Sequence, residues 1–475
     1  MAGKDNSLFL CGHSSSDPSG LKTSLHYGGG DYWLAKLDAR GNVLWDRSFG
    51  GSEGEILTSP GVATSDGGFL MGGSSSSGVS GNKTSPSYGM HDVWLVNVNA
   101  TGNKVWEQSY GGSNWEGFND AIEVEGGFLV AAYSMSGISG NKTTASYGQN
   151  DFWVIRLDST GNKLWERSFG GNGNDVIYNL IPTPDGNFLL CGESSSPPSG
   201  NKTSPRHGQA DFWLVKIDPN GNKLWDKSYG GNSFDIAARI VPAGDGGFIL
   251  GGASSSPISG NKSTAGFGQH DFWLIKVDAD GSIMWEHVYG SPARESMTSL
   301  APAGDGGFLL IGQLSGTDSA TAGNRTAPIY GSFDFWVIKV DANGTMLWDQ
   351  SFGGTEFEGP YNLTSAPDGG VLIAGQSSSD ISGNKSTAGY GESDAWVIKL
   401  TGLPQLTIEP SAGNLRVSWP LSSSGFLLEK TSTLPHVPQA TIWSVVPQQF
   451  QTNEEQHFII LPVVIQNTFY RLRRP

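Results

Sequence analysis

Residues 211–252 read DFWLVKIDPNGNKLWDKSYGGNSFDIAARIVPAGDGGFILGG, and this stretch decides the fold of the chain. Its first residues alternate apolar and polar side chains, which is the pattern of a half-buried strand. A Pro-Asn-Gly-Asn turn leads into a second predicted strand over residues 223–229. After Gly230-Gly231, two more strands are predicted over residues 235–241 and 248–252, joined by an Asp-Gly-Gly turn. Each copy of this pattern therefore predicts four short antiparallel strands.

The pattern repeats along most of the chain. Its marker is an Asp-x-Trp tripeptide, found at Asp31, Asp92, Asp151, Asp211, Asp271, Asp334 and Asp394. Successive markers are 61, 59, 60, 60, 63 and 60 residues apart. A β-propeller consists of four-stranded antiparallel sheets arranged radially, so that few strand edges are exposed. A helical solenoid is excluded because the 3.6-residue hydrophobic period of helices is absent. The sequence predicts an all-β chain whose residues 1–401 form a seven-bladed β-propeller.

The two ends of the chain depart from the repeat. The first copy begins at its second strand, residues 8–12, so the N-terminal blade is predicted to lack its inner strand. The last copy stops at its third strand, residues 394–400. We expect either that the sequence is trimmed upstream or that residues after Leu400 complete the ring. Short alternating runs in residues 402–475, separated by Pro and Ser, predict a small β-sandwich.

Composition excludes several classes of function. The net charge of −16 argues against nucleic acid as a partner, since phosphate binding needs a basic surface. No apolar run reaches the length of a membrane span, and the N-terminus lacks the apolar core of a signal peptide. Cys11 and Cys191 occupy the same place in two distant repeats, so free thiols are expected rather than a disulfide.

The repeat resembles the pyrroloquinoline-quinone-like propeller repeats of large bacterial surface and secreted proteins. The resemblance rests on the succession Asp-Gly-Gly-aromatic, Ser-Gly-Asn-Lys-Thr, Asp-Phe-Trp-x-x-Lys-x-Asp, Gly-Asn-Lys-Leu-Trp and Phe-Gly-Gly. Residues 185–231 match it almost throughout, and it covers roughly residues 5–400. It implies the fold but no particular activity. The quinone-dependent dehydrogenases have eight blades and adjacent cysteines, which this chain lacks, so their cofactor is not carried over.

The C-terminal region resembles a short fibronectin-type-III-like module of secreted bacterial proteins. The shared features are Ser418-Trp419-Pro420 and the terminal run Phe469-Tyr-Arg-Leu-Arg473. Together the two resemblances imply a bacterial protein that works outside the cell or in its envelope.

A repeated polar set lies on the long loop between the second and third strands. It contains Asn82, Lys83 and Tyr88 in one copy, Asn141, Lys142 and Tyr147 in the next, and Asn201, Lys202 and His207 in the third. Amides, hydroxyls and an aromatic face are what a sugar site needs. The alternative is architectural, because such residues also fold a loop through hydrogen bonds to its own backbone. A feature present in every blade favours the architectural interpretation.

A ring of acids forms the second repeated set: Glu55, Glu116, Asp175, Asp235, Glu295 and Glu358. Each is expected at the start of an inner strand, around the funnel on the long-loop face. Carboxylates suit Ca²⁺, which prefers oxygen ligands. The alternative is that each acid pairs with a loop lysine or caps loop amides within its own blade. We expect no other cofactor.

Trp115 breaks the repeat, in the connection between two blades, and is the strongest single candidate for ligand contact, with Glu116 beside it. The eight His show no metal-ligand spacing, and no nucleophile elbow or phosphate-binding loop is present. We therefore expect a binding or scaffold protein rather than an enzyme, with a glycan or protein ligand on the long-loop face. The alternatives are a polysaccharide hydrolase or lyase in the funnel, and a structural module of a surface assembly.

Overall fold

The computed structural model describes residues 3, 7–59, 61–315, 323–365, 370–400, 406–411, 413–420, 427–432, 444–447, 449–453, 456–463 and 468–473. These residues form strands, turns and bends, with no helix among them. Accordingly, within the described ranges no helix is long and apolar enough to cross a membrane. The chain forms two compact units, residues Met1–Thr364 with Ile373–Val397, and Ser365–Leu372 with Ile398–Pro475.

Up to Leu400 the strands form seven antiparallel sheets, and strands that follow one another in the sequence are neighbours in space. The first sheet holds β1 (Leu8–Ser14), β2 (Asp31–Leu37) and β3 (Val43–Phe49). The second holds β4 (Glu55–Ile56), β6 (Phe69–Ser75), β7 (Asp92–Val98) and β8 (Lys104–Tyr110), with β5 (Val62–Ala63) also on β6. The third holds β9 (Glu116–Val124), β10 (Gly127–Ser134), β11 (Asp151–Asp158) and β12 (Lys163–Phe169).

The same order continues in the other four sheets. The fourth holds β13 (Asp175–Pro182), β14 (Phe188–Ser194), β15 (Asp211–Ile217) and β16 (Lys223–Tyr229). The fifth holds β17 (Asp235–Pro242), β18 (Phe248–Ser254), β19 (Asp271–Val277) and β20 (Ile283–Tyr289). The sixth holds β21 (Glu295–Pro302), β22 (Phe308–Ser315), β23 (Phe333–Val340) and β24 (Met346–Phe352), and the seventh holds β25 (Glu358–Ser365), β26 (Val371–Ser377) and β27 (Asp394–Leu400).

The sequence pattern located these strands closely. The strand predicted over residues 223–229 is β16, and the one predicted over 394–400 is β27, both with the expected ends. In the first strand of several sheets, the pairing slips by one residue. In β13 the slip lies between Ile177 and Asn179 and leaves Tyr178 as the extra, bulged residue. An all-β, propeller-like arrangement of four-stranded antiparallel sheets is thus confirmed.

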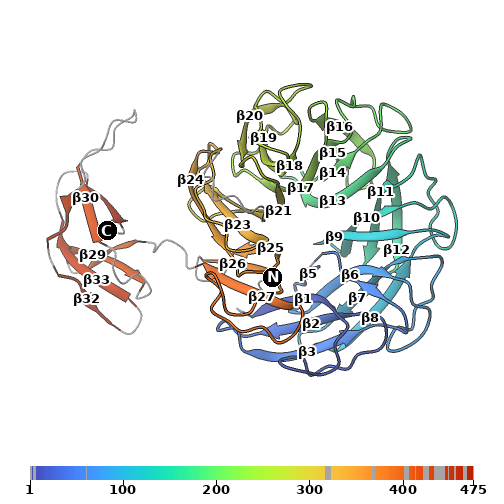
Figure 1. Ribbon diagram of the computed structural model, residues 1–475, viewed down its shortest axis with the longest axis horizontal. Coiled ribbons are helices and arrows are strands. Elements are labelled where there is room, and N and C mark those ends of the chain that lie inside the picture. Colours follow the sequence, from blue (N-terminus) through green and yellow to red (C-terminus); the bar gives the residue numbers. More distant parts are fainter. Residues whose placement is uncertain are drawn as a thin grey trace. The chain divides into compact units, whose positions relative to one another are not determined.

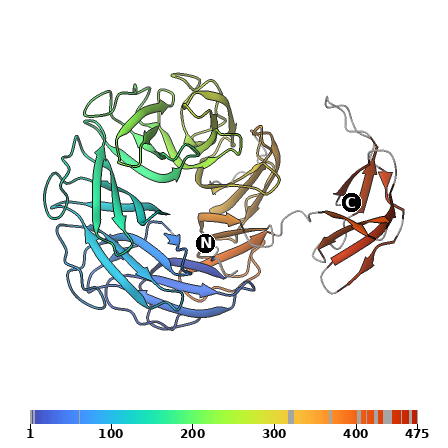
Figure 2. The same cartoon turned by 180° about the vertical axis from the view of Figure 1, so that it is seen from behind.

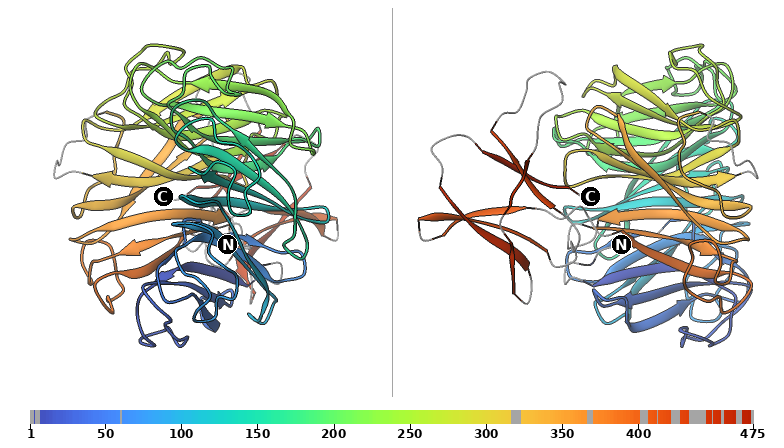
Figure 3. Two further views of the ribbon diagram at one scale, coloured as in Figure 1. Left: turned by 90° about the vertical axis from the view of Figure 1, so that its right-hand side faces the viewer. Right: turned by 60° about the vertical axis from the view of Figure 1, so that its left-hand side comes forward.

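The sheets follow one another around a common centre, with β9, β13, β17, β21 and β25 innermost and β8, β12, β16, β20 and β24 on the outside (Figure 1). The first and last sheets lie side by side in the front and rear views (Figures 1 and 2). In side view the strands of one sheet differ in direction from one strand to the next (Figure 3). This difference is expected from the right-handed twist of strands.

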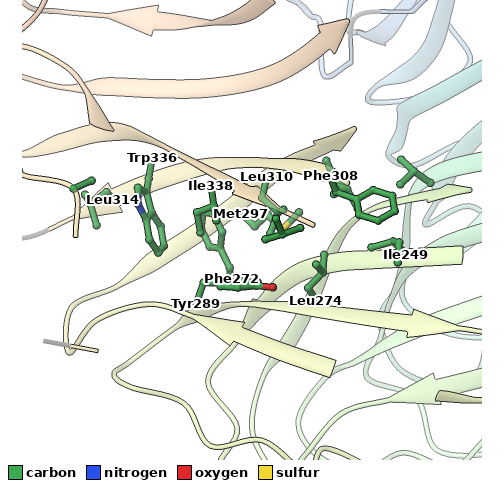
Figure 4. Packing of buried hydrophobic residues seen from close by; sticks show 14 residues of the cluster. Ile249, Phe272, Leu274, Tyr289, Met297, Phe308, Leu310, Leu314, Trp336 and Ile338 are labelled. Carbon is green, nitrogen blue, oxygen red and sulfur yellow. The ribbon is translucent and has the colours of Figure 1, made fainter. Parts of the chain in front are cut away.

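Apolar side chains fill the space between neighbouring sheets. One cluster combines Phe272 and Leu274 from the fifth sheet with Met297, Leu310 and Trp336 from the sixth (Figure 4). The third-strand Trp residues Trp94, Trp153, Trp213, Trp273 and Trp336 are all fully buried. Because each sheet is apolar on both faces, it must be covered by a neighbour on each side.

After residue 405 the described strands form two further sheets. One holds β28 (Thr407–Ser411), β29 (Asn414–Pro420), β33 (Gln456–Pro462) and β32 (Gln451–Thr452). The other holds β31 (Ser444–Val445), β30 (Leu427–Thr431) and β34 (Phe469–Arg473). Val417, Trp419 and Ile459 from the first pack with Leu428 and Val446 in one apolar cluster. Ile442 and Trp443, which form one of the short runs from which the β-sandwich is predicted, lie outside the described residues.

Candidate functional site

The long loops contact the connections between sheets: the Ser139 hydroxyl of the third sheet's loop, for example, accepts the Ser113 N–H of the connection into that sheet at 2.9 Å. At six junctions an Asn of the long loop bridges to the end of the preceding sheet, whereas the first loop carries Leu21 at this position. The amide of Asn201 accepts a hydrogen bond from the Gly170 N–H at 2.9 Å and donates to the Ser168 carbonyl at 2.9 Å. The same pair of bonds is made by Asn82, Asn141, Asn261, Asn324 and Asn384. Each of these Asn side chains therefore ties one sheet to the next.

The loop lysines are buried. Lys83, Lys142 and Lys202 are only 1%, 1% and 3% exposed. Lys202 donates to the Ser204 carbonyl and the Ser228 hydroxyl, both at 2.8 Å, and lies 5.5 Å from the Trp213 ring centre. Burial lowers the pKa of Lys202 to about 8. These contacts hold the loop on the third strand through hydrogen bonds and a cation–π interaction.

The loop is also held by a carboxylate on the fourth strand, a contact that the sequence analysis did not identify. Asp226 accepts hydrogen bonds from the Ser204 N–H at 2.8 Å and the Trp213 indole N–H at 3.1 Å. Thr203 donates to it through both its backbone N–H and its hydroxyl, and Lys223 donates at 2.6 Å. Equivalent carboxylates in other sheets are Asp46, Glu107, Glu166, Glu286 and Asp349. The Asn, Lys and Thr of the repeat therefore serve the fold in the loops that carry them.

The six acids of the predicted ring are each the first residue of an inner strand and are at most 1% exposed. Each accepts the N–H of the residue four positions earlier and a serine hydroxyl. For Asp235 these are Gly231 at 2.8 Å and Ser256 at 2.7 Å. Among the described residues, no group of three or more His, Cys, Asp or Glu side chains is arranged to hold a metal ion.

A second buried carboxylate lies close to each of these acids, across a glycine. A methyl group on Gly230 would come within 2.3 Å of Asp211 Oδ1 and 2.8 Å of Asp235 Oδ2. This closeness explains why the position is glycine. Burial raises the pKa of Glu55, Asp175 and Asp235, and raises that of Glu295 to about 7.

The loop aromatics are partly accessible. Tyr88 and Tyr147 are 36% and 42% exposed, and each packs its Cβ side against the glycine of the next loop, Gly140 or Gly200; His207 does the same at Gly260. Tyr147, Asn201 and Arg167 line a hollow of 340 Å³, and an equivalent hollow of 410 Å³ is lined by Tyr27, Asn82 and Arg47. These hollows are shallow and belong to the repeated architecture.

The repeat changes at one pair of residues on the long-loop face. The residue before the third strand meets the residue before the next inner strand, and we call these two the junction pair. The pairs are Gly30 with Gly54, His91 with Trp115, Asn150 with Asn174, Ala210 with Phe234, His270 with Arg294, and Phe333 with Phe357. The backbones of the junction pairs are alike, but their side chains differ. Each boundary between two neighbouring sheets, which we call a seam, therefore presents different side chains on this face.

The pair His91 and Trp115 is the most elaborate. Their rings stack with centroids 3.7 Å apart, and both side chains are half-buried. The Nδ1 of His91 is buried without a hydrogen-bond partner. Burial lowers the pKa of His91, so the neutral ring is favoured near pH 7. The indole N–H of Trp115 interacts with the Tyr133 hydroxyl.

Tyr133, Tyr178 and Glu193 extend this cluster into the next sheet. Tyr133 and Glu193 occupy the same place in their second strands, opposite Phe152 and Phe212. Tyr178, the bulged residue of β13, interacts with the Glu193 carboxyl group, whose Oε2 is buried without a partner. Burial raises the pKa of both groups. All three side chains are half-buried and so remain partly accessible. We call His91, Trp115, Tyr133, Tyr178 and Glu193 the aromatic cluster.

Only Trp115 of this cluster was identified from the sequence. The signal for Tyr133 and Glu193 was variation at one register position of the repeat, where the second strands carry His13, Ser74, Tyr133, Glu193, Ala253 and Gln313. Glu116, predicted as its companion in ligand contact, is instead fully buried under Gly112 and Ser134.

Gly117 leaves the space that Tyr133 occupies. A methyl group at residue 117 would lie 2.2 Å from Tyr133 Cζ, whereas the equivalent residues in other sheets, such as Ile56 opposite Ser74, carry side chains. Gly117→Ala is therefore expected to displace Tyr133 and to lower the free energy of unfolding by about 1–3 kcal/mol. The double change Gly117→Ile with Tyr133→Ser, which copies the second sheet, should recover most of that loss in urea denaturation. Failure to recover would contradict the assigned contact.

Comparisons with known proteins give distant likenesses. No protein-family model matches the chain. Regulatory protein FlaEY of Caulobacter vibrioides is 22% identical over 370 residues, covering 73% of this chain. The chain spans only 38% of the length of that curated relative. Among solved structures, Kuenenia stuttgartiensis hydrazine synthase aligns over 78% of this chain and 92% of its own, with 10% identity and a TM-score of 0.45. A puromycin hydrolase aligns over 87% and 57%, with 12% identity and a TM-score of 0.46.

Proposed function

We propose that this chain is a non-enzymatic bacterial binding protein, extracellular or associated with the envelope, whose ligand is a glycan held at the aromatic cluster. The observation that carries the proposal is the stacked pair of His91 and Trp115, whose indole N–H interacts with the Tyr133 hydroxyl. On the same face, the repeated polar side chains form hydrogen bonds within the fold. The repeated Asn and Lys side chains form hydrogen bonds inside the fold. Ligand contact is therefore assigned to residues that differ from one copy of the repeat to the next.

A sugar suits this chemistry. A pyranose presents C–H groups on its faces, which pack on an indole or phenol ring, and hydroxyls at its edge, which need donors and acceptors. The cluster supplies the rings of Trp115 and Tyr133 for the faces of the sugar, and the half-buried polar side chains of Tyr133, Tyr178 and Glu193 for its edge. Glu193 is a single acid, whereas glycoside hydrolysis ordinarily uses two carboxyl groups across the scissile bond. The name of the curated relative, a regulatory protein, is compatible with a role in recognition.

The proposal includes a finer view of the fold. We take the seven sheets as blades of one closed ring, and the two C-terminal sheets as a β-sandwich of fibronectin type III kind. Closure is supported by Tyr390 of the last sheet, whose ring would lie 3.9 Å from a methyl group on Gly20 of the first. Tyr27 packs on Gly81 in the same way at the next junction. The location outside the cytoplasm rests on the resemblance of the repeat to secreted bacterial proteins.

Binding to a glycan array, followed by turnover assays on the bound sugars, tests this function. Trp115→Ala is expected to weaken binding of the selected glycan by at least about tenfold, since central aromatic residues dominate such contacts. Phe234→Ala is the matched control, because Phe234 holds the same junction position two seams away and is 42% exposed. It should leave binding unchanged. Equal losses in both variants, or turnover of the bound sugar, would contradict the proposal.

A further inference from the structure

Two hollows lie at seams between neighbouring sheets, and each contains an arginine. The hollow between the third and fourth sheets has a volume of 340 Å³ and is lined by residues that include Tyr147 and Arg167. The hollow between the first and second sheets has a volume of 410 Å³ and is lined by the equivalent Tyr27 and Arg47. Both volumes lie at the small end of the range for small-molecule sites, about 300–1,000 Å³. Each hollow therefore has the size of a site for one small molecule.

The arginine departs from the repeat, although the residues around it belong to the repeat. Arg47 and Arg167 are the fifth residues of the outer strands β3 and β12. The fifth residues of the other outer strands, β8, β16, β20 and β24, are Gln108, Lys227, His287 and Gln350. Because two sheets carry glutamine at this position, the fold does not require a cation here.

Each arginine is fixed in its hollow and keeps donors for a ligand. The Nη1 group of Arg167 donates to the Glu166 carbonyl at 2.8 Å, and its Nη2 group donates to the Asn220 carbonyl at 3.0 Å. The guanidinium carbon lies 5.4 Å from the centre of the Trp165 ring. Arg47 is held in the same way by two carbonyls and a Trp ring. Since a guanidinium has five N–H groups and two of them are used, three remain for a ligand.

The charge of each arginine has no acidic partner. Among the described residues, neither Arg47 nor Arg167 forms an ion pair. Asp46, which lines the hollow beside Arg47, accepts its hydrogen bonds from loop residues and an indole N–H. Asp218, in the turn beside Arg167, accepts those of its own turn. The guanidinium charge can therefore bind an anionic group of a ligand.

The lysines that line the two hollows are already paired. Lys223 donates to Asp226 at 2.6 Å and to the Asn201 carbonyl. Lys104 lies 3.9 Å from Glu107. Because these lysine charges are balanced by acids of their own sheets, the arginine is the cation that each hollow offers to a ligand.

A carboxylate attached to a sugar ring suits such a hollow. The planar guanidinium can donate two parallel N–H groups to the two oxygens of a carboxylate. Tyr147, which is 42% exposed, lines the same hollow as Arg167, and an exposed phenol ring packs on the C–H face of a sugar. An inorganic oxyanion would use the arginine alone and leave the tyrosine ring without a contact. The combination of arginine and tyrosine therefore favours a sugar acid.

We propose that the two hollows are equivalent sites for a sugar carboxylate, such as a uronic acid residue of an acidic glycan. The guanidinium of Arg47 or Arg167 binds the carboxylate, and the ring of Tyr27 or Tyr147 packs on the sugar. No residue of the aromatic cluster lines either hollow. These sites are therefore separate from the glycan site proposed above, and either can exist without the other.

Calorimetric titration of the full chain with glucuronate tests these sites. We expect two molecules to bind per chain. Glucose, which lacks the carboxylate, should bind at least about tenfold more weakly, because the charge-assisted hydrogen bonds are lost. Inorganic sulfate, which lacks the sugar ring, should also bind more weakly than glucuronate. Equal binding of glucose would contradict the role of the arginine, and sulfate that binds as tightly as glucuronate would contradict the assignment of a sugar.

Arginine-to-glutamine variants locate the binding, because glutamine is the residue that β8 and β24 carry at this position. Arg167→Gln and Arg47→Gln should each leave one molecule bound per chain, and the double variant should lose both, with little change in melting temperature. His287→Gln is the matched control, since Nε2 of His287 lies 3.0 Å from the Asn343 carbonyl, as the Arg167 guanidinium does from Asn220. It removes the same contact between sheets and should leave two molecules bound. Two molecules bound by the double variant, or a loss in the control, would overturn the proposal.

Discussion

Asp226→Ala lowers the free energy of unfolding by an expected 3–5 kcal/mol, about the cost of breaking a buried charged network by removing one partner. Asp226 is 7% exposed and accepts hydrogen bonds from Thr203, Ser204, Trp213 and Lys223. Alanine leaves these donors without a partner inside the fold, and each orphaned donor retains the cost of its desolvation. The long loop, the third strand and the fourth strand lose their common anchor together.

Urea denaturation at pH 7 measures this effect. Asp218→Ala, in the exposed turn of the same sheet, is the control, because its hydrogen bonds are confined to Asn220 and Asn222 of that turn. Burial by itself would raise the pKa of Asp226, but hydrogen bonds from Lys223, Thr203 and Ser204 outweigh it and hold the pKa well below its usual range. The stabilisation is therefore present above about pH 4 and is lost as the pH falls further. Equal losses in the two variants would contradict the anchoring role.

Glu295→Gln is expected to have the opposite sign and to stabilise the protein at alkaline pH. Glu295 is fully buried, and burial raises its pKa to about 7, against hydrogen bonds from Ser291 that lower it. The nearby Asp271 charge raises it further. Since the folded-state pKa lies above the unfolded value, the contribution of Glu295 to stability is full at low pH and is lost as the pH rises through 7.

Glutamine removes the cost of burying that charge and keeps the shape of the side chain. Its carbonyl can accept the Ser291 N–H while its amide donates to the Ser291 hydroxyl, so both contacts of Glu295 persist. The variant should gain about 3 kcal/mol at pH 8 and less than about 1 kcal/mol at pH 5. Melting curves at the two pH values measure the difference, with the exposed change Glu53→Gln as control. A gain that is the same at both pH values would rule out ionisation as the cause.

The strands could be predicted from the sequence because each is specified locally. Alternation in residues 223–229 and the glycine-rich turns around them mark β16 without reference to any other part of the chain. The position of the acids, as first residues of β4, β9, β13, β17, β21 and β25, follows from the same period. The shared face of the long loops and the sheet connections follows from strand order alone.

The role of the loop residues could not be predicted in this way. Whether Asn201 contacts a ligand or a neighbouring sheet depends on Ser168 and Gly170, which lie more than thirty residues away in the sequence. The repeat shows that these residues occur together in the sequence, but it does not predict which of them are in contact. Likewise, Trp115 was the only residue of the aromatic cluster identified from the sequence. Its partners could be identified only in the structure, where side chains from different strands and sheets come together.

The repeat by itself thus determined the strands, their order and the side on which the elaborate loops lie, because period and turn chemistry act between residues close in the chain. The tertiary structure decided which polar side chains are occupied by the fold and which stay accessible, as at His91, Trp115 and Glu193. The physical reason is that the burial and the hydrogen bonding of a side chain depend on how surfaces of different sheets pack together. A local sequence pattern does not determine this packing.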